Sequence, residues 1–386
     1  MKSEWKIMKL SDIAEFNPRE SIPRGATAKK VAMDKLQPFC RDIPSYEMEV
    51  FNGGTKFRNN DTIMARITPC LENGKTAKIN ILEENEVGFG STEYIVFRAK
   101  QGVDADYLYY LISSPLVREP AIKSMVGSSG RQRVQTDVLQ NLEVWLPAYD
   151  EQKKIGSILR DLDDKIAINT KINKNLFQQL HAFYSEFFVK SDRDTPLGDV
   201  IVTTSGGTPS RKHDEYYSNS SICWVKSKEL LGNYIHETEE HINDLAVRKS
   251  SAKLLPKYSV LIAMYGATVG ACGIISKPMA CNQAICALLC NENYPYTYLF
   301  QIVYESQQKL INLAVGSAQQ NISQVLIKQL NIHSDLYTIQ KFHTLALPIH
   351  KKIETLQAEN TKLSKLRDTL LPKLMSGELD VSDIDL

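Results

Sequence analysis

One loop carries side chains that are suited to reading the edges of nucleic-acid bases. It runs Gly127-Ser-Ser-Gly-Arg131-Gln132-Arg133. Arginine can donate two hydrogen bonds to guanine, and glutamine can pair in the same two-point way with adenine. The two glycines let the backbone come close to a ligand. We therefore treat Arg131, Gln132 and Arg133 as the leading candidates for contact with DNA, the alternative being an ordinary solvated loop.

A second polar loop, in the other half of the chain, has the same general character. Ser205-Gly-Gly-Thr-Pro-Ser-Arg-Lys212 combines hydroxyl and basic side chains, and its glycines predict a flexible segment. Other basic residues lie in or beside loops that contain glycine or proline. The further candidates for DNA contact are Lys56, Arg58, Arg66 and Lys75 in the first half, and Thr208, Ser210, Arg211, Lys212, Lys226 and Lys228 in the second. For each of them a solvated surface position is the alternative.

The signatures of catalysis are incomplete. Gly74-Lys75-Thr76 resembles the end of a phosphate-binding loop, but Pro69 stands where that motif requires glycine. Asn17-Pro18-Arg19-Glu20 resembles an adenine methyltransferase motif without its second proline and its stacking aromatic residue. The acidic cluster at 161–164 lies on a helical stripe, which is typical of a solvated helix face. No catalytic residue is assigned, and the chain is predicted to bind rather than to catalyse.

The cysteines and the hydropathy pattern indicate a reduced, cytoplasmic protein. Seven cysteines are scattered along the chain, and Cys281, Cys286 and Cys290 lack the spacing of a zinc site. We expect buried thiols and no metal ligands. Met1-Lys-Ser-Glu-Trp5 is not followed by an apolar stretch, and no run approaches the roughly 18 apolar residues of a membrane span. Neither a signal peptide nor a membrane segment is therefore expected.

Length and charge constrain the organisation. The chain has 386 residues, of which 43% are hydrophobic, enough for two or three domains with sizeable cores. Its formal net charge is +1. Nucleic-acid binding is therefore not evident from overall charge, and any DNA-binding face must be a local basic patch.

The chain repeats itself at roughly half its length. Short segments that match in residue type follow one another in the same order in both halves. The matched pairs are residues 5–13 with 194–201, 61–67 with 258–264, 107–112 with 296–302, 125–134 with 314–322, and 142–146 with 330–332. The counterpart of the loop at 127–133 thus carries Gln319, Gln320 and Asn321, followed by Ser323. Because amides replace arginines there, the two halves are expected to prefer different bases.

Each half ends in a segment with a coiled-coil pattern. Residues of the stripe recur in alternating steps of four and three, and the seams include Leu162, Ile166, Asn173, Leu176 and Leu180 in the first half, and Ile353, Leu356, Asn360, Leu363 and Leu370 in the second. A buried asparagine in such a seam costs stability and fixes the register. Each helix is expected to run for about 24–28 residues, or about 36–42 Å, close to one turn of DNA. Packing of each helix on its own domain is the alternative.

These observations predict an α+β protein with a pseudo-two-fold internal repeat. Two globular α/β domains, at 1–146 and 191–333, are expected at opposite ends of an antiparallel two-helix coiled coil. The helices are expected within 147–190 and within 334–386, the second followed by an acidic tail.

The whole chain resembles the specificity subunits of type I restriction-modification enzymes. The resemblance rests on the repeat, on the helical segments and on several stretches taken together. These are Asn60–Pro69, Glu72–Thr76, Gly127–Arg133, Glu151-Gln152, Gly206–Ser210 and Leu366–Gly377. The second half has Ile339-Gln340 in place of the Glu-Gln pair, so the sequence does not establish that the two partner-docking surfaces are equivalent.

The resemblance implies a non-catalytic subunit that binds a split site on double-stranded DNA through two target-recognition domains. Its partners would be two DNA adenine methyltransferase subunits and the restriction subunits that act as motor and nuclease. It implies no cofactor in this chain, because S-adenosylmethionine, ATP and Mg²⁺ would be bound by those partners. A specificity subunit of a motor-less restriction-modification system and a coiled-coil protein scaffold are the alternatives.

Overall fold

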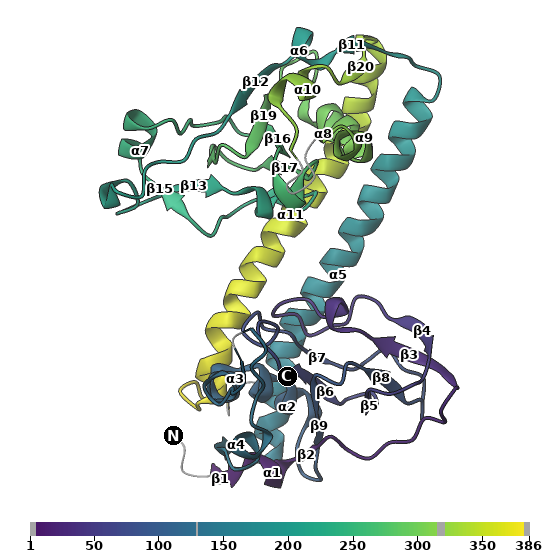
Figure 1. Ribbon diagram of the computed structural model, residues 1–386, viewed down its shortest axis with the longest axis vertical. Coiled ribbons are helices and arrows are strands. Elements are labelled where there is room, and N and C mark those ends of the chain that lie inside the picture. The colour runs from purple at the N-terminus through teal and green to yellow at the C-terminus, as the bar shows by residue number, and fades with distance from the viewer. Residues whose placement is uncertain (1–4, 129, 315–320, 382–386) are drawn as a thin grey trace. The chain divides into compact units, whose positions relative to one another are not determined.

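The computed structural model describes residues 5–128, 130–314 and 321–381. The chain forms two compact units. Unit 1 comprises Met1–Ile168 and Lys362–Leu386, and unit 2 comprises Asn169–Thr361. Each unit holds strands, short helices and a segment of both long helices, α5 and α11 (Figure 1). The predicted fold class, a mixed helix and strand protein with two repeated domains and long helices, is confirmed.

The globular part of unit 1 is built from ten strands, four short α-helices and one 3-10 helix at Met33–Lys35 among the described residues. Its strands are β1 (Lys6–Lys9), β2 (Ala14–Phe16), β3 (Thr27–Val31), β4 (Glu47–Val50), β5 (Thr55–Phe57), β6 (Thr62–Ala65), β7 (Thr76–Lys78), β8 (Gly88–Gly90), β9 (Tyr94–Ala99) and β10 (Glu143–Leu146). Its helices are α1 (Leu10–Ile13), α2 (Ala105–Ser113), α3 (Pro115–Lys123) and α4 (Thr136–Gln140).

Two four-stranded sheets organise unit 1, with strand orders β2-β9-β6-β7 and β4-β3-β8-β5. All four residues of β6 are buried, as expected for a short apolar run in the middle of a sheet. Helix α2 supplies much of the core through Tyr107 to Ile112, all of which are buried. It begins after Asp104, whose carboxylate accepts a hydrogen bond from the Tyr107 backbone N–H, a typical N-cap.

Unit 2 repeats this design with its own set of elements. Its strands are β11 (Arg193–Pro196), β12 (Val202–Ser205), β13 (Ile222–Val225), β14 (Tyr234–Ile235), β15 (His241–Ile242), β16 (Val260–Ala263), β17 (Cys272–Ile275), β18 (Ala280–Cys281), β19 (Ile285–Leu289) and β20 (Asn331–His333). Its short helices are α6 (Leu197–Val200), α7 (Asp244–Lys249), α8 (Tyr296–Glu305), α9 (Gln307–Asn312) and α10 (Gln324–Lys328).

The two units share strand order as well as composition. The sheet β12-β19-β16-β17 of unit 2, extended by β14, matches β2-β9-β6-β7 of unit 1. In the second sheet of each unit, β3 pairs in parallel with β8 and antiparallel with β4, just as β13 pairs in parallel with β18 and antiparallel with β15. The segments 61–67 and 258–264, matched in the sequence, contain β6 and β16, the equivalent central strands. The internal repeat is therefore a repeat of topology.

The long helices α5 (Tyr149–Phe188) and α11 (Leu336–Met375) each contain 40 residues. The predicted helix length of about 24–28 residues is wrong, because both ends of each helix also pack onto globular parts. Ile155 and Leu159 of α5 belong to the core of unit 1, while Tyr184 of α5 and Phe342 of α11 belong to the core of unit 2. Packing of a helix on its own domain and pairing of the two helices therefore occur together.

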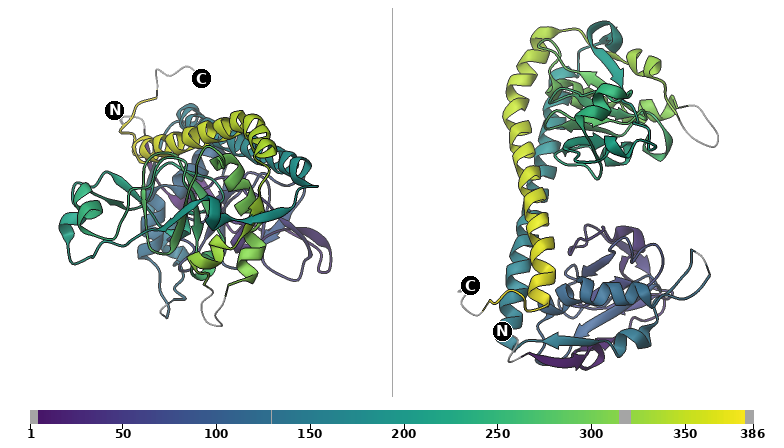
Figure 2. Two further views of the ribbon diagram at one scale, coloured as in Figure 1. Left: turned by 90° about the horizontal axis from the view of Figure 1, so that it is seen from above. Right: turned by 90° about the vertical axis from the view of Figure 1, so that its left-hand side faces the viewer.

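Within each unit the segments of α5 and α11 lie side by side, as both views show (Figures 1 and 2). In unit 2, Asn169 contacts Asn360, and Phe187 contacts Phe342, so rising numbers in α5 meet falling numbers in α11 and the pair is antiparallel. The seam residues differ in burial. Asn173, Leu180, Ile353 and Leu356 are buried, whereas Leu162, Ile166, Leu176, Asn360, Leu363 and Leu370 are half-buried.

One glutamine in each long helix binds the loop that precedes a short core helix. Gln152 of α5 accepts a hydrogen bond from the Asp104 backbone N–H at 3.0 Å and donates to the Pro147 carbonyl at 2.9 Å. Gln340 of α11 donates to the carbonyl of Glu292 at 2.6 Å. Both glutamines thus have an internal structural role, whereas the residues before them differ: Glu151 accepts hydrogen bonds from Trp5, and Ile339 is buried.

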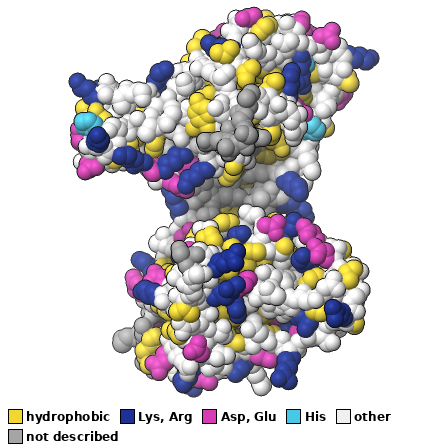
Figure 3. All heavy atoms as spheres, viewed as in Figure 1, with side chains coloured by type: hydrophobic (Ala, Val, Ile, Leu, Met, Phe, Trp, Pro, Cys, Tyr) yellow, Lys and Arg dark blue, Asp and Glu magenta, His cyan; other side chains and the backbone are white. Residues whose placement is uncertain are grey.

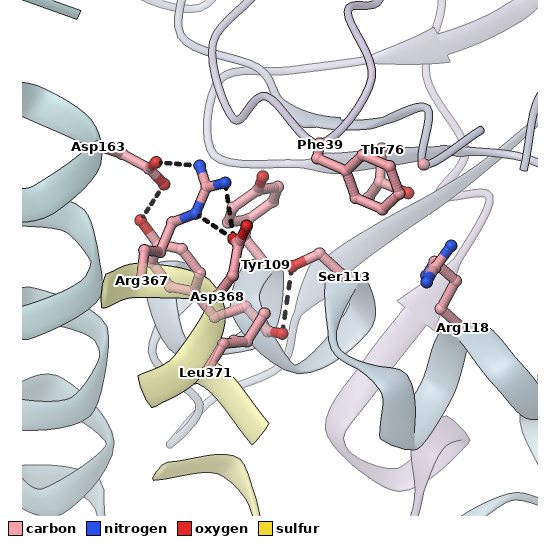
Figure 4. Close-up of a pocket in the computed structure, with 11 residues that line it drawn as sticks. Phe39, Thr76, Tyr109, Ser113, Arg118, Asp163, Arg367, Asp368 and Leu371 are labelled. Atoms are coloured by element: carbon pink, nitrogen blue, oxygen red, sulfur yellow. Dashed lines mark hydrogen bonds and ion pairs between the residues drawn. The ribbon is translucent and has the colours of Figure 1, made fainter. Parts of the chain in front are cut away.

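A buried ion pair joins α5 to α11 within unit 1 (Figure 4). Arg367 donates to Asp163 at 2.7 Å, and Tyr110 donates to the other Asp163 oxygen at 2.7 Å. The Asp163 side chain is 6% exposed and that of Arg367 is 12% exposed. Asp368, which also binds Arg367, is largely solvated. The buried Asp163 carboxylate is charged and has two partners, and a shift of one helix along the other would remove its counter-charge. This contact is therefore specific for one helix register.

Replacing Arg367 with leucine is expected to lower the free energy of unfolding of unit 1 by about 3–5 kcal/mol, because the Asp163 carboxylate would stay buried without its counter-charge. The control Asp368→Asn removes an exposed partner of the same guanidinium and should cost less than about 1 kcal/mol. Urea unfolding of the full chain, followed by circular dichroism, measures both. Losses of equal size would contradict a special role for the buried pair.

Candidate nucleic-acid interface

The loop at 127–133 is held against the end of β6 by backbone hydrogen bonds. The Val134 N–H donates to the Arg66 carbonyl at 2.9 Å, and the Thr68 N–H donates to the Gln132 carbonyl at 3.0 Å. Gly127 has φ of +137°, and a Cβ there would lie 2.9 Å from the Arg131 carbonyl oxygen, so this turn requires glycine. The loop therefore has a defined base from which the exposed Arg131 side chain projects.

A single carboxylate binds both neighbouring arginines of this surface. Arg133 donates to the two oxygens of Glu93, at 2.7 Å from Nη2 and 3.0 Å from Nε. Arg66 approaches the same carboxylate at 3.4 Å. The hydrogen bond from Arg133 is the main reason that the pKa of Glu93 lies below its ordinary value. Glu93 thus holds two predicted DNA-contacting cations at one place on the surface.

A second cluster surrounds an open depression lined by Glu20, Arg58, Asp61 and Arg98. Arg98 donates to both oxygens of Asp61 at 2.7 Å and to Glu20 at 2.7 Å, and Arg58 donates to the same Glu20 oxygen at 2.7 Å. The side chains of Asp61 and Glu20 are 1% and 7% exposed. The hydrogen bond from Arg58, opposed by desolvation and aided by Arg98, lowers the pKa of Glu20. Arg58 is therefore oriented from below by buried carboxylates.

The two other predicted DNA-contacting residues of unit 1, Lys56 and Lys75, differ in what surrounds their ammonium groups. Lys56 lies in β5, with its ammonium 5.4 Å from the centre of the Phe51 ring. Lys75 is half-buried, and its ammonium donates to the Met33 carbonyl at 2.8 Å. That contact gives Lys75 a part in joining loops within the fold.

In unit 2, Arg211 and Lys226 share the carboxylate of Glu240. The Arg211 guanidinium also lies 4.3 Å from the ring centre of Tyr217 and 5.6 Å from that of Trp224. Hydrogen bonds, first from Lys226 and then from Arg211, keep the pKa of Glu240 below its ordinary value despite desolvation. The result is a half-exposed cation stacked on aromatic rings, a kind of surface that suits phosphate and base contacts.

The loop at 205–212, predicted from its composition to be flexible, packs closely against neighbouring backbone at its two glycines. A Cβ on Gly206 would lie 2.2 Å from the Cys281 carbonyl oxygen, and one on Gly207 would lie 2.3 Å from the backbone of Ser251. The Gly207 N–H donates to the Cys281 carbonyl at 2.9 Å, and its carbonyl accepts from the Trp224 indole at 3.0 Å. These glycines permit close backbone packing. The rest of the loop is exposed at Thr208, Ser210, Arg211 and Lys212.

Most of the other residues of unit 2 that were predicted to contact DNA form hydrogen bonds or ion pairs within unit 2. Thr208 donates to Gln283, and the Ser210 hydroxyl accepts from the Lys212 N–H at 3.3 Å. Lys228 pairs with Glu239 at 2.6 Å, with both side chains more than half exposed. Ser323 caps α10 by accepting from the Leu326 N–H at 3.2 Å. Ser323 therefore has a structural role that does not depend on contact with DNA.

The last residues of the two matched loops pair with the segments that follow equivalent strands. Arg133 forms a bridge with Ile67 after β6, and Asn321 forms a bridge with Tyr265 after β16. The Ile322 N–H donates to the Met264 carbonyl at 2.9 Å, as Val134 does to Arg66. Arg133 and Asn321 therefore occupy corresponding positions with different side chains. Gln319 and Gln320 lie outside the described residues.

Sequence reasoning missed the carboxylates that hold these cations, namely Glu20, Asp61, Glu93 and Glu240, and it also missed Arg98. Glu93 and Arg133 are 40 positions apart, and Glu20 and Arg98 are 78 apart, so no local pattern links them. The only signal was the near balance of 46 basic and 45 acidic residues, which implies that many cations have partners. On the visible face of each unit, basic and acidic side chains are indeed interspersed (Figure 3).

Comparison with known proteins gives a consistent result. The profile of the family described as "Type I restriction modification DNA specificity domain" matches this chain twice, at residues 2–178 and 193–361. The MjaIX specificity subunit of Methanocaldococcus jannaschii is 29% identical over 317 residues, covering 74% of this chain and 71% of that protein. The HindI specificity subunit of Haemophilus influenzae is 22% identical over 473 residues, covering 98% of this chain and 100% of that protein.

Among solved structures, the S subunit of a type I restriction-modification system from M. genitalium has the same fold. The TM-score is 0.57 at 14% identity, and the match covers 96% of each chain. In the described part of the chain, no helix is both long and apolar enough to cross a membrane.

The buried Asp61 of unit 1 is expected to be far more important for stability than an exposed carboxylate of unit 2. Asp61→Asn should lower the free energy of unfolding by about 1.5–3 kcal/mol, because two charge-assisted hydrogen bonds from Arg98 are weakened in a buried place. The control Glu239→Gln, which breaks only the exposed pair with Lys228, should cost no more than about 1 kcal/mol. The urea midpoints of the two full-length variants measure both losses. A larger loss for Glu239→Gln than for Asp61→Asn would contradict the structural role of Asp61.

Proposed function

The chain belongs to the family of type I restriction modification DNA specificity domains, and we propose from this membership that it is the DNA sequence-specificity subunit of a type I restriction-modification enzyme. The observation that carries the proposal is the double match of the family profile, one match on each half of a chain whose two units share one strand order. Two similar units with different loop side chains fit a DNA site made of two different half-sites.

Different base preferences of the two units follow from the corresponding loop positions. Unit 1 presents Arg131 and Arg133, with an arginine's preference for guanine edges or phosphates. Unit 2 presents Asn321 at the position that corresponds to Arg133, and asparagine pairs with adenine edges. The carboxylate of Glu93 orients Arg133 and Arg66 before DNA arrives, which reduces the entropy lost on binding.

In unit 2 the proposed contact surface is centred on Arg211. Its guanidinium is held by Glu240 and stacked near Tyr217 and Trp224, while one side remains open to solvent. Such a cation can contact a phosphate or a base without first losing its partner, because a guanidinium has five N–H donors. Lys212 and Lys226 extend the positive charge of this surface.

The proposed role is recognition without catalysis in this chain. Binding of two DNA adenine methyltransferase subunits would bring S-adenosylmethionine to the site, and restriction subunits would bring ATP hydrolysis with Mg²⁺. The specificity subunit of a motor-less restriction-modification system shares the same DNA-binding role and differs only in partners. A coiled-coil scaffold between two protein-binding domains is the alternative from another class, and it predicts no salt-sensitive affinity for DNA.

Mapping of methylated adenine by long-read sequencing tests the proposal directly. Cells that carry this chain together with the methyltransferase gene of its own system should show methylation at a split motif, and cells that lack only this chain should not. Methylation of the same motif in both strains would mean that the chain does not supply specificity. Affinity for random DNA that does not change with salt would favour the scaffold.

Replacement of both Arg131 and Arg133 with alanine should affect one half-site only. Binding of the methyltransferase complex to its motif should weaken roughly five- to 150-fold if the arginines contact bases, with relaxed specificity in that half-site. The matched variant Arg211→Ala should act on the other half-site. Equal weakening on specific and random DNA would identify phosphate contacts instead, and unchanged binding would remove the two arginines from the interface.

A further inference from the structure

Three side chains with metal-binding atoms meet in the three-stranded sheet of unit 2, where Cys223 and His241 are the chain neighbours of Trp224 and Glu240 of the Arg211 cluster. Cys223 and His241 stand opposite each other in the antiparallel pair of β13 and β15, two strands that are labelled in Figure 1. Glu237 lies in the loop between β14 and β15. The Cys223 Sγ is 3.0 Å from Oε1 of Glu237 and 3.6 Å from Nε2 of His241, and Nε2 is 2.8 Å from Oε1. In the described part of the chain this trio is the one group of its kind with metal-ligand spacing.

These distances are close to those of a tetrahedral zinc site. Zinc binds thiolate sulfur at about 2.3 Å and imidazole nitrogen or carboxylate oxygen at about 2.0–2.2 Å. At tetrahedral angles, such bonds place the ligand atoms about 3.4–3.6 Å from each other. The sulfur and nitrogen already have this separation. Only the Glu237 oxygen has to move outward, by about half an ångström, and its side chain is exposed enough to do so.

The three side chains of the trio differ in burial. Cys223 is 1% exposed and lies at the bottom, whereas the side chains of Glu237 and His241 are 37% and 29% exposed. An ion can therefore enter from solvent, bind three protein ligands and keep water as its fourth. Sulfur, nitrogen and oxygen together suit a borderline-soft ion such as Zn²⁺ and do not suit Mg²⁺, which prefers oxygen.

The equivalent place in unit 1 carries a built-in positive charge. Val31 of β3 pairs with Gly90 of β8, as Val225 of β13 pairs with Cys281 of β18, so Lys29 corresponds to Cys223. The Lys29 ammonium binds Glu86 at 2.9 Å and approaches Glu83 at 3.6 Å. In unit 2 no lysine stands at this strand position, but Lys277 lies 3.9 Å from Glu237 and is close enough to Cys223 to oppose the rise that burial causes in the pKa of its thiol.

We propose that Cys223, Glu237 and His241 bind a zinc-class divalent cation that joins β13, β15 and the loop between β14 and β15. The ion takes the place that the Lys29 ammonium has in the other repeat. It is a structural ion, because its three ligands connect separate elements of the sheet, namely β13, β15 and the loop between β14 and β15. The expectation from sequence that the chain lacks metal ligands considered Cys281, Cys286 and Cys290 and missed this trio, whose members come from separate elements.

Titration of the full-length, reduced and chelator-stripped protein with Co²⁺ tests the proposal. One equivalent should bind with the intense absorption band of a cobalt–thiolate bond, Zn²⁺ should abolish the band, and an excess of Mg²⁺ should leave it unchanged. Absence of the band at one equivalent, with all seven cysteines reduced, would overturn the proposal and leave a hydrogen-bonded trio.

Variants separate this site from other cysteines. Cys223→Ser should lose the band, whereas the control Cys40→Ser, which alters an exposed thiol in unit 1, should retain it. Glu237→Gln and His241→Gln, both at partly exposed positions, should weaken Co²⁺ at least about tenfold, as loss of ligand chemistry requires. Zn²⁺ should raise the Tm of the unmodified chain and of Cys40→Ser, but not that of His241→Gln. An equal rise in all variants would place the ion elsewhere and refute the assignment.

Discussion

The structure depends on how two 40-residue helices cover their apolar stripes. A helix of this length exposes more hydrophobic surface than one globular core can bury, and unburied apolar surface costs roughly 25 cal/mol per Å². Within each unit, α5 and α11 share the task, each covering the other and both packing against the globular part. The aromatic cluster of Tyr184, Phe188 and Phe342 shows this for unit 2, where both helices contribute to one core. Neither globular part is therefore complete without residues from both long helices.

Polar groups in the helix contact then decide which alignment of the two helices is stable. Asn169 donates to Asn360 and to Glu359 at 2.9 Å, and Asp163 pairs with Arg367. Leucine seams tolerate a shift of one heptad, because one apolar layer resembles the next. A buried carboxylate or amide does not tolerate it, because the shifted alignment would leave it without a partner, at a cost of about 1–3 kcal/mol or more. The chain gives up some stability here and gains a single register.

The near-neutral charge of the chain and its proposed affinity for DNA are compatible because the cations are held in pairs. Glu93 binds Arg66 and Arg133, Glu240 binds Arg211 and Lys226, and Glu20 binds Arg58 and Arg98. Each carboxylate reduces the long-range attraction for phosphates while it fixes the direction of a guanidinium. Such a surface suits selective binding better than indiscriminate binding, since less of its affinity comes from charge alone.

The sequence by itself determined the repeat, the fold class and the existence of the long helices, because these depend on local periodicity and on segments that recur in order. The steps of the seam are visible without coordinates, as is the match of Arg133 with Asn321 across the halves. Only the tertiary structure decided which residues share a site. Glu93 with Arg133, Asp163 with Arg367, and Cys223 with Glu237 and His241 come from elements whose contact depends on strand pairing and helix packing. The tertiary structure also decided the role of the glycines at 206 and 207. The composition of their loop suggests flexibility, whereas close backbone packing is what requires glycine at these positions. Residues far apart in the chain form no motif with a recognisable spacing, so only the fold that brings them together determines which of them act as one site.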